Sequence, residues 1–378
     1  MPTVHRKPFG RAHGQSETDL WTLESGTGVR AEILTYGGVL HSLTVPDTAG
    51  EPGPVVRSLP ALDDYTDKNP YFGAIVGRYA NRIAHGRFTL DGTTHHIPAN
   101  DRGHALHGGP DGFHTRIWQA EADRTDSAAV LRLTLHSPDG DMGFPGALDV
   151  TATYTLDTTG TLAVDYTAAT DRPTVVNLTN HAYLNLGDDD ILGHTLQVDA
   201  DAYLPVDAGS IPEGPPAPVT GTPFDLTTPH RIGERLAHPD AQLDRAGGYD
   251  HCWVLRPATT PGTLRRAARL TAPRDRRTLE LWTTEPGLQI YTANQLDGAF
   301  TDGTGRRHQR HGSLCLETQH LPDSPNRPGH PSTVLRPGET LRSRTEWRFP
   351  HLRADEARIR TAGPPGQVTG HRRPRSGR

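Results

Sequence analysis

Glycine and proline interrupt this sequence at short intervals along its whole length, and no other feature limits the fold as much. The chain of 378 residues contains 40 glycines and 33 prolines, and they are spread out rather than bunched. Between them lie short runs of strand-like sequence such as Ala147–Leu156 and Thr161–Ala169. Dense turn residues between such runs favour many short strands. The sequence therefore predicts an all-β fold, a large β-sandwich with few short helices.

Only two segments favour a helix, and both are short: Ala61–Lys68 and Ile232–Leu243. No internal repeat and no convincing linker divides the chain, so residues 1–351 are predicted to form a single domain. Residues 352–378 are rich in arginine and proline without apolar periodicity, which predicts a disordered tail. Pro205–Pro223 is also rich in proline and glycine, and we expect a long ordered rim loop there.

The charge and the cysteine content exclude several classes of protein. A formal net charge of −5 gives no general attraction to nucleic acid or to an anionic membrane. No apolar run approaches the roughly 20 residues that span a bilayer, and no signal-peptide core follows Met1–Arg11. Two cysteines do not form a disulfide framework. We therefore expect a cytoplasmic protein without nucleic-acid or membrane partners, and we expect a monomer or a weak dimer.

The stretch Val175–Leu186 carries an unusual polar face. Alternate residues of a strand point to opposite faces, and one face of this stretch is apolar except for Asn180. The other face carries neutral hydrogen-bonding groups and a histidine: Asn177, Thr179, His181, Tyr183 and Asn185. Because amide, hydroxyl and imidazole groups can together donate and accept hydrogen bonds, this face suits a neutral polyhydroxylated ligand. A half-exposed strand of a β-sandwich is the alternative interpretation.

Two carboxylates stand out in other predicted strands. Glu317 lies among leucines in Ser313–Gln319, where a buried charge costs free energy unless it has a partner or a function. Asp250 stands at the entry to a strand in Gly248–Trp253. The structural alternatives are an ion pair with an arginine for Glu317 and a turn position for Asp250.

A histidine and two arginines complete the set of candidates. His107 precedes two glycines in Ala105–Gly109, as in a tight loop that brings the backbone near a ligand, and an ordinary turn is the alternative. Arg78 and Arg82 lie four residues apart, and surface ion pairs are the alternative for them. A glutamate can act as a base and a histidine can supply a proton near neutrality. Such groups can move protons on a neutral polyol without a cofactor.

Metal and nucleotide sites are not indicated. The sequence has 21 histidines, but neither His104-x-x-His107 nor His308-x-x-His311 sits on a predicted helix with a third ligand. The two cysteines form no Cys-x-x-Cys pair. No Gly-x-Gly-x-x-Gly, Gly-x-x-x-x-Gly-Lys or Gly-x-Ser-x-Gly motif occurs. We therefore expect no metal and no cofactor.

Taken together, these motifs resemble those of the aldose 1-epimerases, also called galactose mutarotases. Asn177–Leu186 is similar to the Asn-His-Ser-Tyr-Phe-Asn-Leu segment of that family, with Ala182 and Leu184 in place of the commoner Ser and Phe. The other similar motifs follow in the family's order: Gly77–Ile83, Leu106–Gly109, Gly221–Asp225, Gly248–His251 and Leu316–Gln319. The similarity runs from about Pro8 to Phe349. The Pro205–Pro223 loop departs from the family's usual sequence, so the preferred sugar depends on whether that loop borders the cleft.

The resemblance implies a galactose mutarotase-like β-supersandwich that interconverts the α- and β-anomers of free hexoses such as galactose and glucose. It implies that Glu317 is the general base that takes the proton of the anomeric hydroxyl. His181 is then the general acid that protonates the ring oxygen, and His107 is the second active-site histidine. Contacts to the sugar hydroxyls are implied for five further residues: Asn81, Arg82, Tyr183, Asp250 and Gln289.

Three other functions remain open at this point. An epimerase for a phosphorylated hexose would need a cationic cluster, and Arg78 with Arg82 is a thin basis for one. A sugar-binding module without turnover would be expected to lack the base or the acid. A sugar lyase or hydrolase would need a second carboxylate suitably spaced from Glu317, and Asp250 is the candidate.

Overall fold

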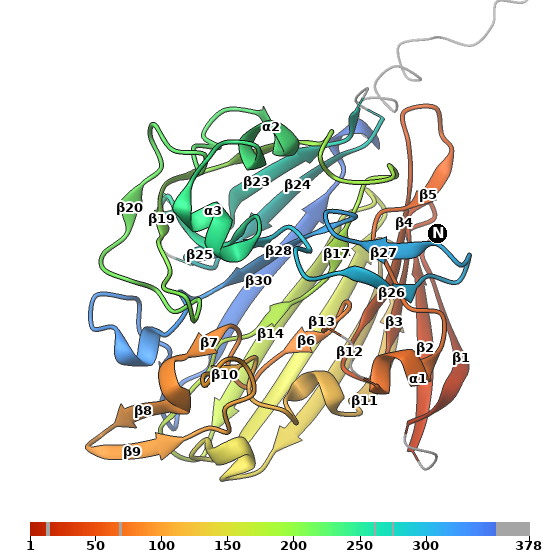
Figure 1. The fold of residues 1–378 in the computed structure, drawn as a ribbon. Coiled ribbons are helices and arrows are strands. Elements are labelled where there is room, and N and C mark those ends of the chain that lie inside the picture. The colour runs from red at the N-terminus through yellow and green to blue at the C-terminus, as the bar shows by residue number, and fades with distance from the viewer. Residues whose placement is uncertain (13–15, 68–69, 261, 274–275, 353–378) are drawn as a thin grey trace, which may run out of the picture.

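Antiparallel strands are the main regular structure of the protein, as the computed structural model in Figure 1 shows. The structure describes residues 1–12, 16–67, 70–260, 262–273 and 276–352. Three large sheets with five, six and nine strands contain most of these strands, and the predicted all-β fold is confirmed. None of the helices in the described ranges is long and apolar enough to cross a membrane. The predicted tail falls, from residue 353 onward, outside the described residues.

The nine-stranded sheet forms one wall of the molecule. In spatial order its strands are β11 (Gln119–Arg124), β12 (Ala128–Ser137), β13 (Leu148–Asp157), β14 (Leu162–Thr170), β30 (Leu341–Arg348), β24 (Thr278–Thr283), β23 (Arg265–Thr271), β18 (Thr195–Val198) and β21 (His230–Arg231). The last strand of the described residues, β30, pairs with β14 on one side and β24 on the other. The sheet therefore joins segments from both halves of the chain.

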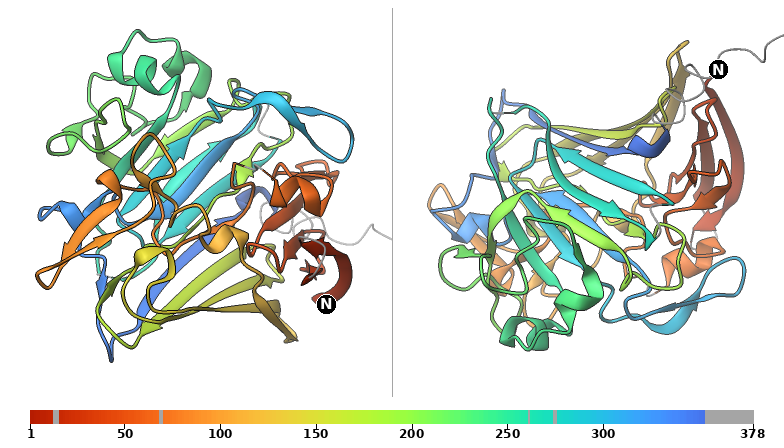
Figure 2. Two further views of the ribbon diagram at one scale, coloured as in Figure 1. Left: turned by 60° about the horizontal axis from the view of Figure 1, so that its bottom comes forward. Right: turned by 90° about the horizontal axis from the view of Figure 1, so that it is seen from above.

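The six-stranded sheet packs against the nine-stranded sheet (Figures 1 and 2). In spatial order its strands are β17 (Tyr183–Leu184), β28 (Leu314–Gln319), β25 (Gly287–Tyr291), β22 (Asp250–Leu255), β19 (Ala200–Leu204) and β20 (Ala217–Pro218). Leu316 and Ile290 belong to the same buried cluster as Leu281 of the nine-stranded sheet. Because side chains alternate along a strand, the neighbours Glu317 and Gln289 face away from that core.

The five-stranded sheet stands at the side of the sandwich, where Figure 2 shows it in dark red. Its strands are β1 (Thr3–Ala12), β2 (Ser16–Glu24), β3 (Arg30–Leu34), β4 (Leu40–Pro46) and β5 (Pro52–Pro54). Leu20 and Leu34 share a second buried cluster with Tyr183, Tyr291 and Cys315. This sheet therefore packs at one end of the six-stranded sheet, on the face that carries Tyr183 and Tyr291.

The remaining strands are short and lie mostly in the connections. They are β6 (Ile75–Val76), β7 (Arg82–Ile83), β8 (Arg87–Leu90), β9 (Thr93–His96), β10 (Ala105–Leu106), β15 (Thr174–Val175), β16 (Thr179–Asn180), β26 (Asp297–Thr301), β27 (Arg307–Gln309) and β29 (Val334–Leu335). The pair β7–β10 brings Arg82 opposite Leu106, next to His107.

The α-helices that lie wholly within the described residues are short: α1 (Leu62–Thr66), α2 (Ile232–Leu236) and α3 (Ala241–Ala246). The first lies inside the predicted Ala61–Lys68 segment, of which Lys68 is outside the described residues. The prediction of one helix over Ile232–Leu243 is wrong. Pro239 has no N–H to continue a helix, and the Asp240 carboxylate caps a new one by accepting hydrogen bonds from the backbone of Gln242 and Leu243.

The stretch Val175–Leu186 is not one continuous strand. It contributes to β15, β16 and β17, which pair with three different partners, β29, β6 and β28. All of its residues are buried, so the alternative of a half-exposed strand is wrong. Asn180, the polar exception on its apolar face, donates to the carbonyl of Gly73 at 2.8 Å and to the hydroxyl of Tyr154 at 3.1 Å. Hydrogen bonding satisfies this buried amide nitrogen, as burial requires.

Candidate active site

A cavity opens between the outward face of the six-stranded sheet and the loops that cover it. Both walls contribute polar and aromatic side chains. The lining residues are Pro70, Tyr71, Asn81, Arg82, Leu106, His107, His181, Tyr183, Asp250, Gln289, Tyr291, Gln295 and Glu317. All eight residues predicted from the sequence to form the site are among them, so the structure brings the whole predicted set together. Their individual roles stay predictions.

The sheet wall places three polar side chains next to one another on adjacent strands. Gln289 of β25 lies opposite Glu317 of β28 in the strand register. On the other side of β25, the first residue of β22 is Asp250, and its Oδ1 accepts a hydrogen bond of 2.7 Å from Nε2 of Gln289. Residues on one face of neighbouring strands lie side by side. One outward-facing residue from each of three neighbouring strands therefore contributes to a continuous polar surface.

The loop wall holds His107 through a reciprocal contact with Asn81. Both residues have positive φ, 54° for His107 and 64° for Asn81, a conformation that favours only a few residue types such as Asn and His. The His107 N–H donates to the carbonyl of Asn81, and the Asn81 N–H donates to Nδ1 of His107 at 3.1 Å. Burial holds the pKa of His107 well below its usual value, so the ring is neutral. Since Nδ1 accepts a hydrogen bond, Nε2 carries the ring hydrogen and is a donor.

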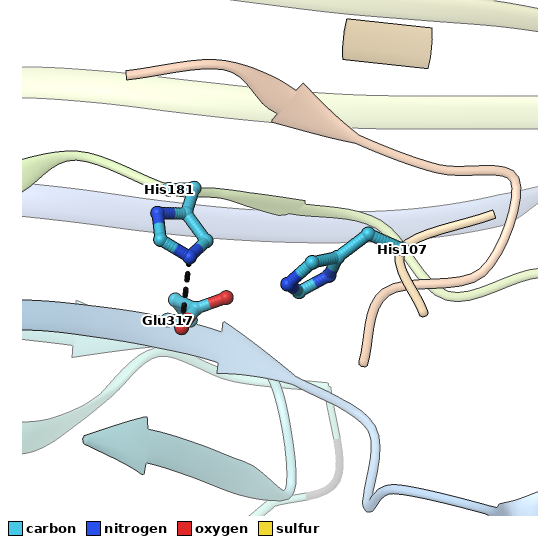
Figure 3. Close-up of side chains that lie close together, drawn as sticks. All are labelled: His107, His181 and Glu317. Carbon is cyan, nitrogen blue, oxygen red and sulfur yellow. Dashed lines mark ion pairs between the residues drawn. The ribbon is translucent and has the colours of Figure 1, made fainter. Parts of the chain in front are cut away.

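His181 and Glu317 face each other in the cavity, as Figure 3 shows. Nε2 of His181 lies 3.8 Å from Oε1 of Glu317, and their side chains are only 5% and 2% exposed. Burial lowers the pKa of His181 to about 4 and raises the pKa of Glu317 well above its usual range. On the other edge of the imidazole, Nδ1 lies 3.5 Å from Sγ of the buried Cys315.

Charged neighbours also shift the pKa values of this pair. The negative charge of Asp250 raises the pKa of both His181 and Glu317, because it favours the more protonated form of each. Arg82 opposes this effect at Glu317 and lowers its pKa. Oε2 of Glu317 is buried and has no hydrogen-bond partner in the described residues. A buried acceptor without a partner is costly, so this oxygen is available to a hydroxyl of a ligand.

The groups His107, His181 and Glu317 also lie close enough together to be considered as a metal site. Their candidate ligand atoms are all within 4.8 Å of one another. A histidine binds a metal through a nitrogen without hydrogen, but the Asn81 N–H already occupies Nδ1 of His107 and leaves the hydrogen on Nε2. Metal binding through Nε2 would break that hydrogen bond. The arrangement fits proton transfer better than metal coordination.

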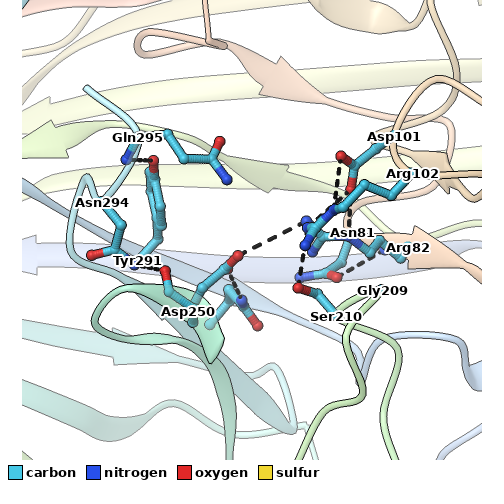
Figure 4. A network of polar contacts seen from close by, with 12 residues as sticks. Asn81, Arg82, Asp101, Arg102, Gly209, Ser210, Asp250, Tyr291, Asn294 and Gln295 are labelled. Atoms are coloured by element: carbon cyan, nitrogen blue, oxygen red, sulfur yellow. Dashed lines mark hydrogen bonds and ion pairs between the residues drawn. The ribbon is translucent and has the colours of Figure 1, made fainter. Parts of the chain in front are cut away.

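Arg82 reaches the cavity between two carboxylates, as Figure 4 shows. Its Nε donates to Oδ2 of Asp101 at 2.8 Å, and its Nη2 lies 3.8 Å from Oδ2 of Asp250. The side chain is only 6% exposed. Arg82 is therefore a fixed hydrogen-bond donor in the cavity rather than a mobile surface charge.

The polar face predicted for Val175–Leu186 serves the ligand cavity only in part. His181 and Tyr183 line the cavity, but the hydroxyl of Tyr183 donates to the carbonyl of Pro70 at 3.0 Å. The amides of Asn177 and Asn185 donate to backbone carbonyls instead of facing the cavity. Side chains that looked available in the sequence therefore hold the irregular backbone around His181.

Five residues that line the cavity were not predicted: Pro70, Tyr71, Leu106, Tyr291 and Gln295. The ring centroid of Tyr71 lies 4.6 Å from that of His107 and 5.7 Å from that of His181. Tyr71 has a φ of 65° in a connection, so no strand periodicity marks it. Tyr291 follows Gln289 on the same face of β25, and that alternation was a signal that could have identified it.

Arg78 is not part of the cavity. Its guanidinium is buried, and it donates to the carbonyls of Ser137 and Gly146 at 3.0 and 2.7 Å. The alternative interpretation of surface ion pairs is wrong for Arg78, because it is buried and donates to backbone carbonyls and to the Ser137 hydroxyl. Its role is to hold the segment after β12 in place.

The protein is an all-β sandwich whose polar cavity holds a histidine next to a glutamate. This combination is typical of a protein that transfers protons on a neutral polyhydroxylated ligand. The sequence model of aldose 1-epimerase matches residues 19–348. The chain is 40% identical over 353 residues to galactose mutarotase of Rattus norvegicus, covering 92% of this chain and 99% of that protein. It belongs to the aldose 1-epimerase family.

Two bacterial relatives agree with this assignment. Aldose 1-epimerase of Escherichia coli K12 is 38% identical over 334 residues, which cover 87% of this chain and 94% of that protein. The crystal structure of galactose 1-epimerase from Lactobacillus acidophilus matches with a TM-score of 0.81 and 28% identity, over 92% of this chain and 99% of that one. The family and the fold that the motifs implied are thus confirmed.

Proposed function

We propose that this protein is an aldose 1-epimerase that interconverts the anomers of free hexoses such as galactose and glucose. The observation that carries the proposal is the pair of His181 and Glu317, with Nε2 and Oε1 3.8 Å apart in a cavity of hydrogen-bonding groups. Anomerisation needs a proton removed from one oxygen and a proton delivered to another oxygen on the same carbon. Two proton-transfer groups side by side suit that requirement.

In the proposed reaction the single proton of the pair lies on His181, which is the less populated of its two positions. Glu317 then takes the proton of the anomeric hydroxyl while His181 gives its proton to the ring oxygen. The bond between the anomeric carbon and the ring oxygen breaks, and the hydroxyl becomes the carbonyl of the open-chain aldehyde. Rotation about the adjacent carbon–carbon bond exposes the other face of the carbonyl. Reclosure with the two roles exchanged gives the other anomer and restores the protonation of the pair.

Four further groups support this reaction by binding the sugar. His107 presents Nε2–H, because its Nδ1 accepts from the backbone of Asn81. Gln289, Arg82 and Asp250 offer an amide, a guanidinium and a carboxylate to the hydroxyls. Oε1 of Gln289 is buried without a partner in the described part of the chain, so it is free to accept from a hydroxyl. The cytoplasmic location and the monomeric or weakly dimeric state stay predictions.

A phosphorylated hexose is a poorer candidate substrate. Among the described residues that line the cavity, Arg82 is the one with a permanent positive charge, and it is already placed between Asp101 and Asp250. Arg78, the other arginine considered, donates to carbonyls elsewhere. A phosphate bears about two negative charges and calls for several free cationic donors.

The proposal predicts that the protein accelerates the mutarotation of freshly dissolved α-galactose and α-glucose, in proportion to protein concentration. Polarimetry measures this rate above the spontaneous background. Because the described residues that line the cavity include no free cationic cluster, we expect kcat/KM for glucose 6-phosphate to be at least about tenfold lower than for glucose. Saturable binding of galactose without any acceleration would contradict the proposal and indicate a binding module. Release of product from a glycoside would indicate a hydrolase instead.

A further inference from the structure

The Pro205–Pro223 loop does not line the cavity, yet its first half is tightly built. Within the described residues, no member of this loop is among the lining residues. The part that we call the 206–212 loop closes on itself through a bridge between Val206 and Pro212. The carboxylate of Asp207 accepts from the N–H groups of Gly209 and Ile211 at 2.8 and 3.0 Å. Such a closed loop keeps its shape and can act as a fixed support.

Helix α3 and the segment before β10 hold this loop in place. Gln242 of α3 accepts from the Val206 N–H at 2.8 Å and donates to the Val206 carbonyl at 3.1 Å. At the tip of the loop, a Cβ on Gly209 would come within 2.4 Å of Nε2 of His104. The loop therefore rests directly on the segment that also contains Asp101 and Arg102.

Arg102 connects the loop to Asp101, as Figure 4 shows. Its Nη1 donates to the carbonyl of Ala208 at 3.3 Å, and its Nη2 donates to the hydroxyl of Ser210 at 3.1 Å. The same guanidinium donates to both carboxylate oxygens of Asp101, each at 3.3 Å. The Arg102 side chain is 40% exposed, so each of these contacts is individually weak.

Asp101 connects Arg102 and the 206–212 loop to Arg82, which lines the cavity. Its Oδ2 accepts from Nε of Arg82 at 2.8 Å, whereas Nη2 of Arg82 is 3.8 Å from Asp250. A hydrogen bond at Nε fixes the plane of a guanidinium, so its terminal N–H groups point in one direction. Arg82 lines the cavity but Asp101 and Arg102 do not. Contacts outside the cavity thus set the direction of a donor inside it.

We propose that Asp101 is a positioning residue for Arg82. Because Arg102 ties Asp101 to the 206–212 loop, this loop then helps to determine which aldose the cavity accepts. This inference rests on the proposed function and deepens it. Galactose and glucose differ only in the orientation of one hydroxyl. A rigid donor aimed at one hydroxyl position discriminates between them, because the wrong orientation leaves a buried polar group unpaired.

The test compares Asp101→Asn, Arg102→Ala and the double variant with the wild type. For Asp101→Asn we expect the KM for galactose to rise about tenfold while kcat stays within about threefold, because a charge-assisted hydrogen bond is lost but the acid–base pair is intact. The ratio of kcat/KM for galactose to that for glucose should move toward one. Arg102→Ala should raise the KM for galactose by about threefold and should move the galactose-to-glucose ratio toward one by a similar factor. The double variant should resemble Asp101→Asn alone, since Arg102 acts through Asp101.

Asp199→Asn is the matched control. Asp199 pairs with Arg266 at 2.9 Å, and its side chain is 22% exposed compared with 23% for Asp101, but it lies away from the cavity. This variant should leave KM and the sugar ratio unchanged. An unchanged KM in Asp101→Asn, an equal rise in Asp199→Asn, or additive effects in the double variant would overturn the inference.

A titration of galactose followed by NMR gives a second readout that does not depend on turnover. The dissociation constant should rise about tenfold in Asp101→Asn and remain unchanged in Asp199→Asn. A wild-type protein that binds galactose without accelerating its mutarotation would contradict the proposed function, and the same titration would still test the role of Asp101. Equal dissociation constants for Asp101→Asn and the wild type would contradict the positioning role.

Discussion

Replacement of Glu317 by Gln is expected to lower kcat for galactose mutarotation by about a thousandfold with little change in KM. The amide has nearly the same shape but cannot take the proton of the anomeric hydroxyl, and a positioned general base contributes about 10²–10⁴-fold. The measurement is the initial rate by polarimetry after subtraction of the spontaneous rate. Retention of more than about a tenth of the activity would contradict the assignment of Glu317 as the base.

The fold should survive this substitution. Burial raises the pKa of Glu317, so the folded protein binds a proton there more tightly than the unfolded chain does. A group with a raised carboxyl pKa lowers the stability of the fold as pH increases toward that pKa. Gln carries no charge at any pH and removes this contribution. Thermal unfolding should therefore show Glu317→Gln to be at least as stable as the wild type at neutral pH.

The pH dependence of the wild type provides an independent check on the pair. One proton resides on the pair between the pKa of His181, about 4, and the raised pKa of Glu317. Below about pH 4 a second proton binds and no base is available; above the upper pKa the last proton is lost and no acid is available. We expect kcat/KM to be level across neutrality and to fall at both ends. The alkaline decrease should disappear from the residual activity of Glu317→Gln.

Replacement of His181 by Asn is expected to lower kcat by about a hundredfold or more. Asn can hydrogen-bond to the ring oxygen but cannot protonate it, so ring opening loses its acid. The ground-state contacts of the sugar with Arg82, Asp250 and Gln289 remain, and KM should change by less than about threefold. Steady-state polarimetry over a range of galactose concentrations separates the two constants.

The double variant with Glu317→Gln provides the control for His181→Asn. If the two groups act as one unit, the loss in the double variant should be close to that of Glu317→Gln alone. Multiplicative losses would mean that His181 and Glu317 act independently. A kcat for His181→Asn within a few-fold of the wild type would show that another group supplies the proton to the ring oxygen.

Local patterns in the sequence identified a large part of this site, because strand periodicity decides which side chains share a face. Glu317 among leucines and the polar row with His181 were visible as departures from an apolar alternation. The same reasoning failed for Asn177 and Asn185, whose amides hold backbone carbonyls. A hydrogen-bonding side chain looks the same in a sequence whether its partner is a ligand or the chain itself.

Helix boundaries and irregular backbone also show where prediction from the sequence was incomplete. The two helices in Ile232–Leu243 are separated by Pro239 and Asp240, which are local signals that could have been used. Tyr71 instead enters the cavity from a connection with a positive φ, for which no periodicity exists. Its place over His107 and His181 depends on how that connection packs against distant segments.

The sequence by itself determined the all-β character of the chain and its family, and it pointed to the candidate proton-transfer groups, since these follow from residue types, short motifs and local alternation. Only the tertiary structure decided that β17 pairs with β28 and brings His181 to 3.8 Å from Glu317. Strand pairing between distant segments depends on the packing of the whole sandwich and leaves no local trace. The protonation of the pair likewise arises from burial and from the charges of Asp250 and Arg82, which exist around it only in the folded protein.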